Sequence, residues 1–350
     1  MTLKRSQDYY GGCLLGGAIG DALGWPVEFL RHQEIIKKYG VDGITDLITT
    51  SSGKAEITDD TQMTLFTAEG LLRAETRWNN KGICHIPSVV HFSYHRWLHT
   101  QGHSKNSDLD WIYDGWLITI KELHHQRAPG NSCLSALLSG KQGTTEHPIN
   151  NSKGCGGVMR VAPIGLFFPK EEAFEIAVDC AALTHGHPSG YLSAGALAYI
   201  IAAIIEGDDL ELAITNSVME LLKHDGHEEC SELIYQAITL ANSDEKPLAC
   251  ITQLGEGWVG EEALAIAIYC ALKYKNDFRL AQIAAVNHDG DSDSTGSITG
   301  NILGAYLGLS NIPSSWIEHV ELSHVITQIA DDLFSRYSDS KEWRNRYPGY

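Results

Sequence analysis

The sequence predicts an all-α protein, and two observations carry that prediction. Apolar residues recur at helical spacing in long stretches, whereas the alternating apolar and polar pattern of strands is scarce. Glycines also fall at every fourth position in two separate stretches, a spacing that places them on one face of a helix. Hydrophobic residues make up 43% of the 350 positions and charged residues 20%, which is the composition of a globular protein with a large core.

The helical pattern is clearest in five stretches: Met63–Leu72, Phe174–Leu183, Leu192–Ile205, Ala263–Leu272 and Trp316–Phe334. Pro and Gly clusters separate such stretches, and none of these clusters is long enough to be an interdomain linker. We therefore expect a single domain over residues 1–350, with a C-terminal helix and a polar tail over 315–350. Two polar stretches without periodicity, His99–Asp110 and Gly140–Lys153, are expected to form surface loops.

The glycine spacing indicates close helix packing. The first series comprises Gly12, Gly16, Gly20 and Gly24, and the second comprises Gly296, Gly300, Gly304 and Gly308. Inside a helix each glycine costs about 1 kcal/mol relative to alanine, which is tolerated where another backbone must approach closely. Such ridges are best known in membrane helices, but Asp21, Asn301 and the short apolar runs argue against a membrane span. We expect two tightly packed core helices, and the alternative is that the spacing is incidental.

The charge balance bears on the binding partners. With 26 Lys+Arg against 44 Asp+Glu, the formal net charge is −18, and the sequence contains no run of basic residues. Because nucleic acids and anionic membrane surfaces are bound through clustered Lys and Arg, both are disfavoured as partners. The eight cysteines are scattered singly, and the N-terminus lacks the apolar core of a signal peptide. We therefore expect a soluble, cytoplasmic protein with reduced thiols.

Two acidic clusters precede apolar helical stretches, one at Thr58–Thr61 and the other at Asp289–Thr295. Helix capping explains one or two of these residues, but several like charges within one turn are costly unless a cation is bound. Carboxylate and hydroxyl oxygens select hard cations, Mg²⁺ first, with Mn²⁺ or Ca²⁺ as alternatives. An EF-hand loop starting at Asp289 does not fit, because Ser294 and Gly300 stand where glycine and a bidentate glutamate are needed.

A glycine-rich turn, Ser152–Arg160, leads into a further apolar run. Its backbone N–H groups could approach a phosphate, although its spacing matches neither the P-loop nor the dinucleotide fingerprint, and an ordinary tight turn is the alternative. His185 and His187 follow, without a further Cys or His partner at the spacing of a zinc site. A histidine that hydrogen-bonds a ligand or a carbonyl group is therefore favoured over zinc.

Together these motifs resemble the ADP-ribosylglycohydrolases, the family that includes the dinitrogenase-reductase-activating glycohydrolases. The matching segments, which occur in family order over residues 11–308, are Gly20–Gly24 with Pro26–Phe29, Thr58–Thr61, Gly156–Pro163, Thr184-His185 and Gly290–Ser294. The resemblance implies an all-α, compact orthogonal bundle of many helices around a cleft with two Mg²⁺ or Mn²⁺ ions. It also implies an enzyme that removes ADP-ribose from a modified side chain.

The resemblance further implies roles for particular residues. It places the metal ligands at Thr58, Asp59, Asp60, Asp291, Asp293 and Ser294, where serine departs from the commonest family pattern. It places the substrate contacts at Gly154, Cys155, Gly156, Gly157, Met159 and His185, with the diphosphate on the glycine-rich turn. Glu28 falls on a family glutamate at the cleft mouth. Either Glu28 or Asp60 is the candidate base that activates water for attack at an oxocarbenium-like carbon. Asp21 has no assigned role.

The expected activity is release of ADP-ribose from a modified protein, with ADP-ribosyl-arginine as the first substrate to consider. A second hypothesis keeps the metals but changes the substrate to serine-linked, polymeric or O-acetyl ADP-ribose, or to a phosphate ester. A third is a non-catalytic ADP-ribose-binding or structural protein. The clustered carboxylates argue against this third hypothesis, because a scaffold has no use for several like charges held together.

Overall fold

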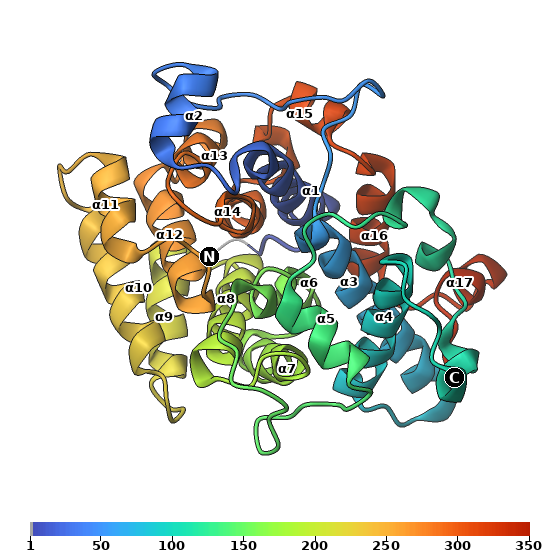
Figure 1. Cartoon of the computed structure of the whole chain (residues 1–350). Helices are drawn as coiled ribbons and strands as arrows, with labels where there is room; N and C mark the ends of the chain where they lie inside the picture. The colour runs from blue at the N-terminus through green and yellow to red at the C-terminus, as the bar shows by residue number, and fades with distance from the viewer. Residues whose placement is uncertain (1–2) are drawn as a thin grey trace.

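Helices form the regular framework of residues 3–350, the part of the chain that the structure, a computed structural model, describes (Figure 1). These residues contain no β-strand, only isolated bridges between Ala55 and Val320 and between Gly154 and Val259. The α-helices are α1 (Gln7–Gly24), α2 (His32–Tyr39), α3 (Asp59–Lys81), α4 (Ile86–Thr100), α5 (Asn131–Leu138), α6 (Ala162–Phe167), α7 (Lys170–Ala182), α8 (Pro188–Glu206), α9 (Leu210–Leu221), α10 (Glu228–Ala241), α11 (Pro247–Leu254), α12 (Gly260–Lys273), α13 (Phe278–Val286), α14 (Ser292–Leu307), α15 (Ser314–His319), α16 (Ser323–Ser335) and α17 (Lys341–Arg346). Short 3-10 helices lie between them: η1 (Trp25–Val27), η2 (Ser107–Ile112), η3 (Leu117–Thr119), η4 (Lys121–Leu123), η5 (Cys155–Gly157) and η6 (Leu309–Asn311). The predicted all-α fold is confirmed.

Four of the five predicted helical stretches lie in single helices: α3, α7 with its C-terminal cap Leu183, α8 and α12. The prediction of one helix over Trp316–Phe334 is wrong, because the chain leaves helical geometry between α15 and α16. Leu322 has a φ of +57° there. The Ala55 N–H donates to the carbonyl of His319, and the Glu321 N–H donates to the carbonyl of Ala55. These bonds to a distant segment replace the helical ones.

The two predicted surface loops have different outcomes. Gly140–Lys153 contains no helix or strand, as expected. The prediction for His99–Asp110 is wrong in part, because α4 continues to Thr100 and η2 begins at Ser107. The Asn106 side chain accepts a hydrogen bond from the N–H of Asp108, which is a local capping bond that starts the short helix.

The two glycine series meet in the antiparallel pair α1 and α14, which lie side by side (Figure 1). A Cβ atom built on Gly296 would come within 2.5 Å of the carbonyl oxygen of Gly20, a distance that real side chains do not adopt. The predicted close packing of two core helices is confirmed. Gly308 is an exception to the predicted ridge, since it follows the end of α14 and has a φ of +83°. The glycine pairs in contact are Gly12 with Gly304, Gly16 with Gly300 and Gly20 with Gly296.

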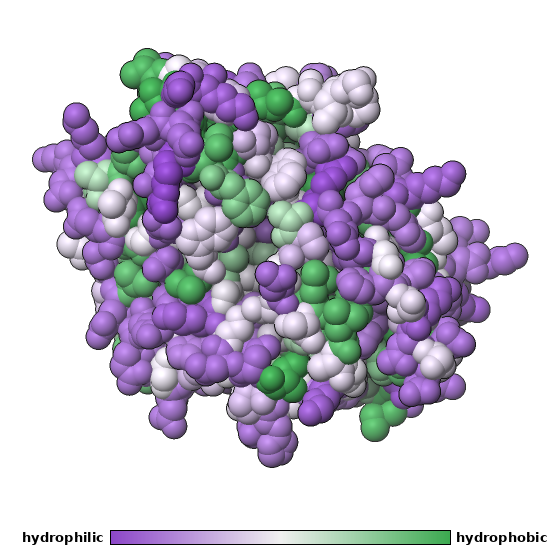
Figure 2. Space-filling view, in the orientation of Figure 1, coloured by the Kyte–Doolittle hydropathy of each residue, from purple (hydrophilic) through white to green (hydrophobic). Residues whose placement is uncertain are grey.

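A central helix, α8, packs against α6, α7, α9 and α12. It is long and apolar enough to cross a membrane by length and composition alone, but 89% of that apolar window is buried inside the protein, as in a core helix. The segment of α1, η1 and α2 meets the same criterion only as a pair of helices bent by 91°. The surface facing the viewer is mostly hydrophilic, with less polar residues gathered near its centre (Figure 2).

The α1–α14 pair determines where two acidic segments lie. At the end of the pair Gly24 lies against the backbone of Ser292, so the C-terminus of α1 meets the N-terminus of α14. The chain then turns through η1 and places Glu28 beside Asp291 and Asp293. Close glycine packing therefore brings together carboxylates that are more than two hundred residues apart in the sequence.

Candidate active site

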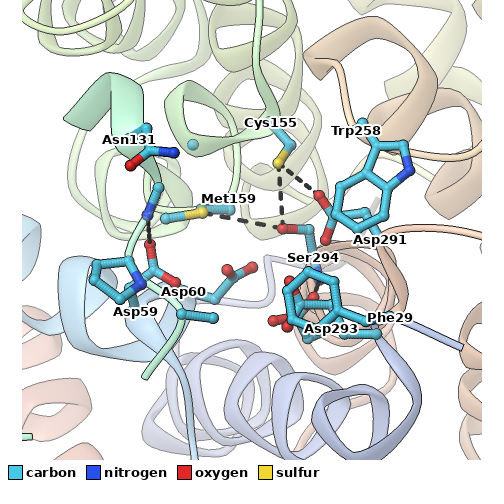
Figure 3. Close-up of a pocket in the computed structure, with 15 residues that line it drawn as sticks. Phe29, Asp59, Asp60, Asn131, Cys155, Met159, Trp258, Asp291, Asp293 and Ser294 are labelled. Carbon is cyan, nitrogen blue, oxygen red and sulfur yellow. Dashed lines mark hydrogen bonds between the residues drawn. The ribbon is translucent and has the colours of Figure 1, made fainter. Parts of the chain in front are cut away.

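A cleft of about 450 Å³ opens where the starts of α3 and α14 meet the glycine-rich turn (Figure 3). Nine of the predicted site residues line it: Glu28, Asp59, Asp60, Cys155, Gly156, Met159, Asp291, Asp293 and Ser294. The remaining lining residues, which the sequence analysis did not assign to the site, are Phe29, Ala128, Pro129, Gly130, Asn131 and Trp258. Four predicted site residues, namely Thr58, Gly154, Gly157 and His185, are not part of the lining.

The start of α3 is held by Asp21, the residue without an assigned role. The buried Asp21 carboxylate accepts hydrogen bonds from the N–H groups of Thr58, at 3.0 Å, and Thr61, at 3.1 Å. The Thr61 hydroxyl donates to the same carboxylate. Thr58 caps the helix, because its hydroxyl oxygen accepts from the N–H of Asp60 at 3.3 Å. These bonds orient the first turn, so that the carboxylates of Asp59 and Asp60 face the cleft.

The carboxylates on the α14 side are held by backbone and side-chain contacts. The N–H of Asp291 donates to the carbonyl oxygen of Glu256 at 2.8 Å, which fixes the turn before the helix. The Asp291 carboxylate accepts from the thiol of Cys155 at 2.7 Å. Oxygens of Glu28, Asp291 and Asp293 all lie within 4.8 Å of one another. Three carboxylates thus converge on one point beneath the glycine-rich turn.

Burial and mutual repulsion raise the pKa values of these carboxyl groups. The pKa of Glu28 rises to about 10, first because the group is buried and then because Asp293 and other acids lie close. Burial also raises the pKa values of Asp59, Asp60 and Asp293 well above the ordinary range, and raises that of Asp291 to about 6. Buried carboxylates that repel one another are stable as anions only when a positive charge joins them.

The oxygen atoms present fit a hard divalent cation. Oε2 of Glu28 and Oδ1 of Asp60 are buried and have no hydrogen-bond partner among residues 3–350. Carboxylate and hydroxyl oxygens are the ligands that Mg²⁺ and Mn²⁺ prefer, and Ser294 adds a hydroxyl at the same cleft wall. An unpartnered buried oxygen costs free energy unless a ligand satisfies it, so the cluster suits cation binding.

The glycine-rich turn adopts the geometry of a helix start. Its first internal backbone hydrogen bond runs from the N–H of Val158 to the carbonyl of Cys155. Gly156 and Gly157 come before Val158 in the chain, so their N–H groups have no partner within the turn. Amide groups at such a position are available to an anion. Gly156 lines the cleft, whereas Gly154 pairs with Val259 and does not.

His185 lies beneath this turn and does not reach the cleft. Its side chain is buried, and a Cβ atom on Gly156 would meet the imidazole ring at 3.1 Å. Nδ1 of His185 lies 2.8 Å from the hydroxyl of Thr184, which accepts from Arg160. Burial, with the nearby Arg160 charge, lowers the pKa of His185 to about 3, so the ring is neutral. In this structure His185 supports the turn from below, which differs from the ligand contact that the sequence analysis expected.

The fold and the cleft define an all-α protein with a buried acidic site beside a glycine-rich turn. The chain belongs to the ADP-ribosylglycohydrolase family, whose family model matches residues 2–342. The family and its curated relatives are ADP-ribosyl glycohydrolases, so the protein is an enzyme of that class. The resemblance inferred from the motifs is confirmed.

Individual relatives align along nearly the whole chain. The ADP-ribosylarginine hydrolase Tri1 of Serratia proteamaculans is 26% identical over 95% of this chain and 80% of its own length. The ADP-ribosyl-[dinitrogen reductase] glycohydrolase of Rhodospirillum rubrum is 25% identical over 92% of this chain and 93% of its own. A solved structure, an ADP-ribosylglycohydrolase-related protein complex, covers 95% of this chain and 99% of that chain, with a TM-score of 0.65 and 24% identity. That structural likeness supports the fold.

Proposed function

We propose that this enzyme is a metal-dependent hydrolase that releases ADP-ribose from ADP-ribosylated arginine side chains of proteins. The observation that carries the proposal is the buried cluster of Glu28, Asp291 and Asp293, whose oxygens lie within 4.8 Å of one another, as a divalent cation requires. In the same cleft Oε2 of Glu28 and Oδ1 of Asp60 have no hydrogen-bond partner among residues 3–350. The arginine linkage is supported by the printed name of the Serratia relative. A protein bearing ADP-ribose is the substrate in this proposal, and free ADP-ribose is a product.

Two Mg²⁺ ions, or Mn²⁺ in their place, would be held by the cleft oxygens. The proposed ligands are those that the sequence analysis named: Thr58, Asp59, Asp60, Asp291, Asp293 and Ser294. When bound, such ions supply positive charge that favours binding of the ribose hydroxyls and stabilises charge in the transition state. Thr58 is the least exposed residue of the set, and its hydroxyl oxygen already accepts the hydrogen bond that caps α3.

Other groups of the cleft would bind the diphosphate and accept a proton. The N–H group of Gly156, the glycine of this turn that lines the cleft, would bind the diphosphate, so that much of the binding energy comes from a part of the substrate remote from the reacting carbon. Glu28 or Asp60 would accept the proton of the attacking water as the glycosidic bond breaks. Each of these carboxylates has an oxygen without a hydrogen-bond partner in the described part of the chain, which a base requires.

The test is a hydrolysis assay on two linkages. The protein is incubated with an ADP-ribosyl-arginine protein and, separately, with an ADP-ribosyl-serine peptide, each with Mg²⁺ or with EDTA. We expect release of ADP-ribose from the arginine linkage with Mg²⁺, none with EDTA, and none from an Asp291→Ala/Asp293→Ala double variant. Asp244→Ala, which removes an exposed carboxylate in the turn between α10 and α11, is the matched control.

Each other result has a defined meaning. Cleavage of the serine linkage alone would overturn the assignment of arginine while keeping the hydrolase. Release that continues in EDTA and in the double variant would overturn the metal dependence. If the protein cleaves neither substrate but still binds ADP-ribose, the result would favour a binding protein or another linkage.

A further inference from the structure

Two large aromatic side chains stand exposed at the mouth of the cleft. Phe29 is 68% exposed and Trp258 is 38% exposed, although both line the cleft. Their rings stack with centroids 5.9 Å apart and planes inclined by 20°. Figure 3 shows the pair on one side of the pocket next to Asp291 and Asp293, with Asp59 and Asn131 on the opposite side. What distinguishes this pair from other exposed aromatic residues is that its two rings stack on each other at the wall of the acidic cleft.

Trp258 stands on a firmly held segment, Glu256–Gly260. The carbonyl of Trp258 accepts from the N–H of Cys155 at 3.2 Å, and the N–H of Gly260 donates to the carbonyl of Lys153 at 2.8 Å. The Glu262 carboxylate accepts from the N–H groups of Glu256 and Gly257, both at 3.1 Å. The position of the indole ring is therefore tied to the glycine-rich turn on one side and, through Glu256, to the start of α14 on the other.

Phe29 stands on the segment between η1 and α2. It follows Glu28 directly, and two residues later the exposed Arg31 forms ion pairs with Glu256, at 2.5 Å, and Asp289, at 3.5 Å. Phe29 is the more exposed of the two rings, so a planar group at the cleft mouth can stack beside the pair.

The chemistry around the pair favours a cation. Arg31 is paired with the acids at the rim, and the fifteen residues that line the cleft include no lysine or arginine. The aromatic faces lie directly outside the carboxylates that the proposed function assigns to the ribose end of the substrate. A leaving group that extends from that ribose toward the cleft mouth would meet Phe29 and Trp258. A guanidinium is both planar and cationic, and such a group stacks well on an indole face.

We propose that Phe29 and Trp258 form the subsite for the modified arginine, and that they determine the preference for a guanidinium leaving group. The proposal rests on the proposed function and adds the residues that select the linkage. A serine-linked leaving group is neither charged nor planar, so stacking at this subsite would not increase its binding affinity. Trp258 is the principal contact, because an indole face attracts a cation more strongly than a phenyl face.

The test measures the arginine substrate and the product separately. We compare Trp258→Ala, Trp258→Phe and Phe29→Ala with the unchanged protein, and use Trp78→Ala as the control, because Trp78 is also exposed but lies on α3 outside the cleft. For Trp258→Ala we expect KM for an ADP-ribosyl-arginine substrate to rise about tenfold, within the about two- to thirtyfold range of cation–π contacts. We expect the affinity for ADP-ribose itself to change less than about twofold.

The conservative variant Trp258→Phe tests whether an aromatic face is what the substrate needs. Trp258→Phe retains an aromatic face and should recover most of the lost affinity, and circular dichroism would show whether each variant is folded. If Trp258→Ala weakens ADP-ribose binding as much as it raises KM, the pair binds the adenine instead and the proposal is wrong. If all three variants keep the original KM, the subsite is also refuted. If the unchanged protein leaves ADP-ribosyl-arginine intact, the proposed function fails first, and this inference fails with it.

Discussion

Replacing Gly296 with alanine should force apart the two helices that position the cleft. The added Cβ atom would lie 2.5 Å from the carbonyl oxygen of Gly20, 2.9 Å from its carbonyl carbon and 2.8 Å from Cγ1 of Val286. Overpacking of this kind costs up to about 3 kcal/mol, and the better helix propensity of alanine returns about 1 kcal/mol. We therefore expect the free energy of unfolding to fall by about 2 kcal/mol.

A glycine on the same pair of helices supplies the matched control. A Cβ atom on Gly11 would meet only Cδ2 of Leu309, at 3.4 Å, which is an ordinary contact. Gly11→Ala should therefore be neutral or stabilising by up to about 1 kcal/mol. Urea unfolding followed by circular dichroism, in EDTA, would measure both variants. Equal stability of Gly296→Ala and the unchanged protein, or equal damage from Gly11→Ala, would refute the account of the glycine packing.

Three further predictions concern the acidic cleft. Because the pKa of Glu28 is raised from 4.5 to about 10, the folded metal-free protein holds this proton more tightly than the unfolded chain. The contribution of Glu28 to stability in EDTA should thus be complete below pH 4.5 and be lost as the pH rises toward 10. Between these pH values the free energy of unfolding should fall less steeply in Glu28→Gln than in the unchanged protein, and an equal slope in both proteins would count against this assignment. Glu28→Gln should also reduce turnover while leaving ADP-ribose binding largely intact, and an unimpaired rate would exclude Glu28 as the base. Asp21→Asn removes one of the acceptors that hold the start of α3, so calorimetry should show Mg²⁺ affinity reduced about ten- to a hundredfold, and unchanged affinity would contradict this role.

The helices were predictable where apolar residues recur at helical spacing. Four strongly periodic stretches, such as Leu192–Ile205, lie in single helices because their apolar faces are buried by packing. The break near Leu322 was not predictable, since it depends on backbone hydrogen bonds to Ala55, more than two hundred and fifty residues away in the sequence. The glycine spacing indicated close packing, but Gly308 belongs to the turn after the helix rather than to the ridge.

The acidic residues of the cleft were predictable from the sequence, whereas the aromatic residues that line it were not. Asp59 and Asp291 stand in local clusters that the sequence shows directly, and both reach the same cleft. Phe29 and Trp258 carry no local signal, because they become partners only when two loops meet in space. Asp21 lies among the glycines of the first motif, yet only the structure shows its bonds to the start of α3.

The central claim is that this acidic cleft binds divalent cations, and a calorimetric titration tests it most directly. Protein freed of metal with EDTA and then dialysed would be titrated with Mg²⁺, and separately with Mn²⁺, beside the Asp291→Ala/Asp293→Ala double variant and the control Asp244→Ala. The account predicts binding of two ions per chain, retained in the control and lost in the double variant. Absence of binding by the unchanged protein, or binding that persists in the double variant, would contradict it.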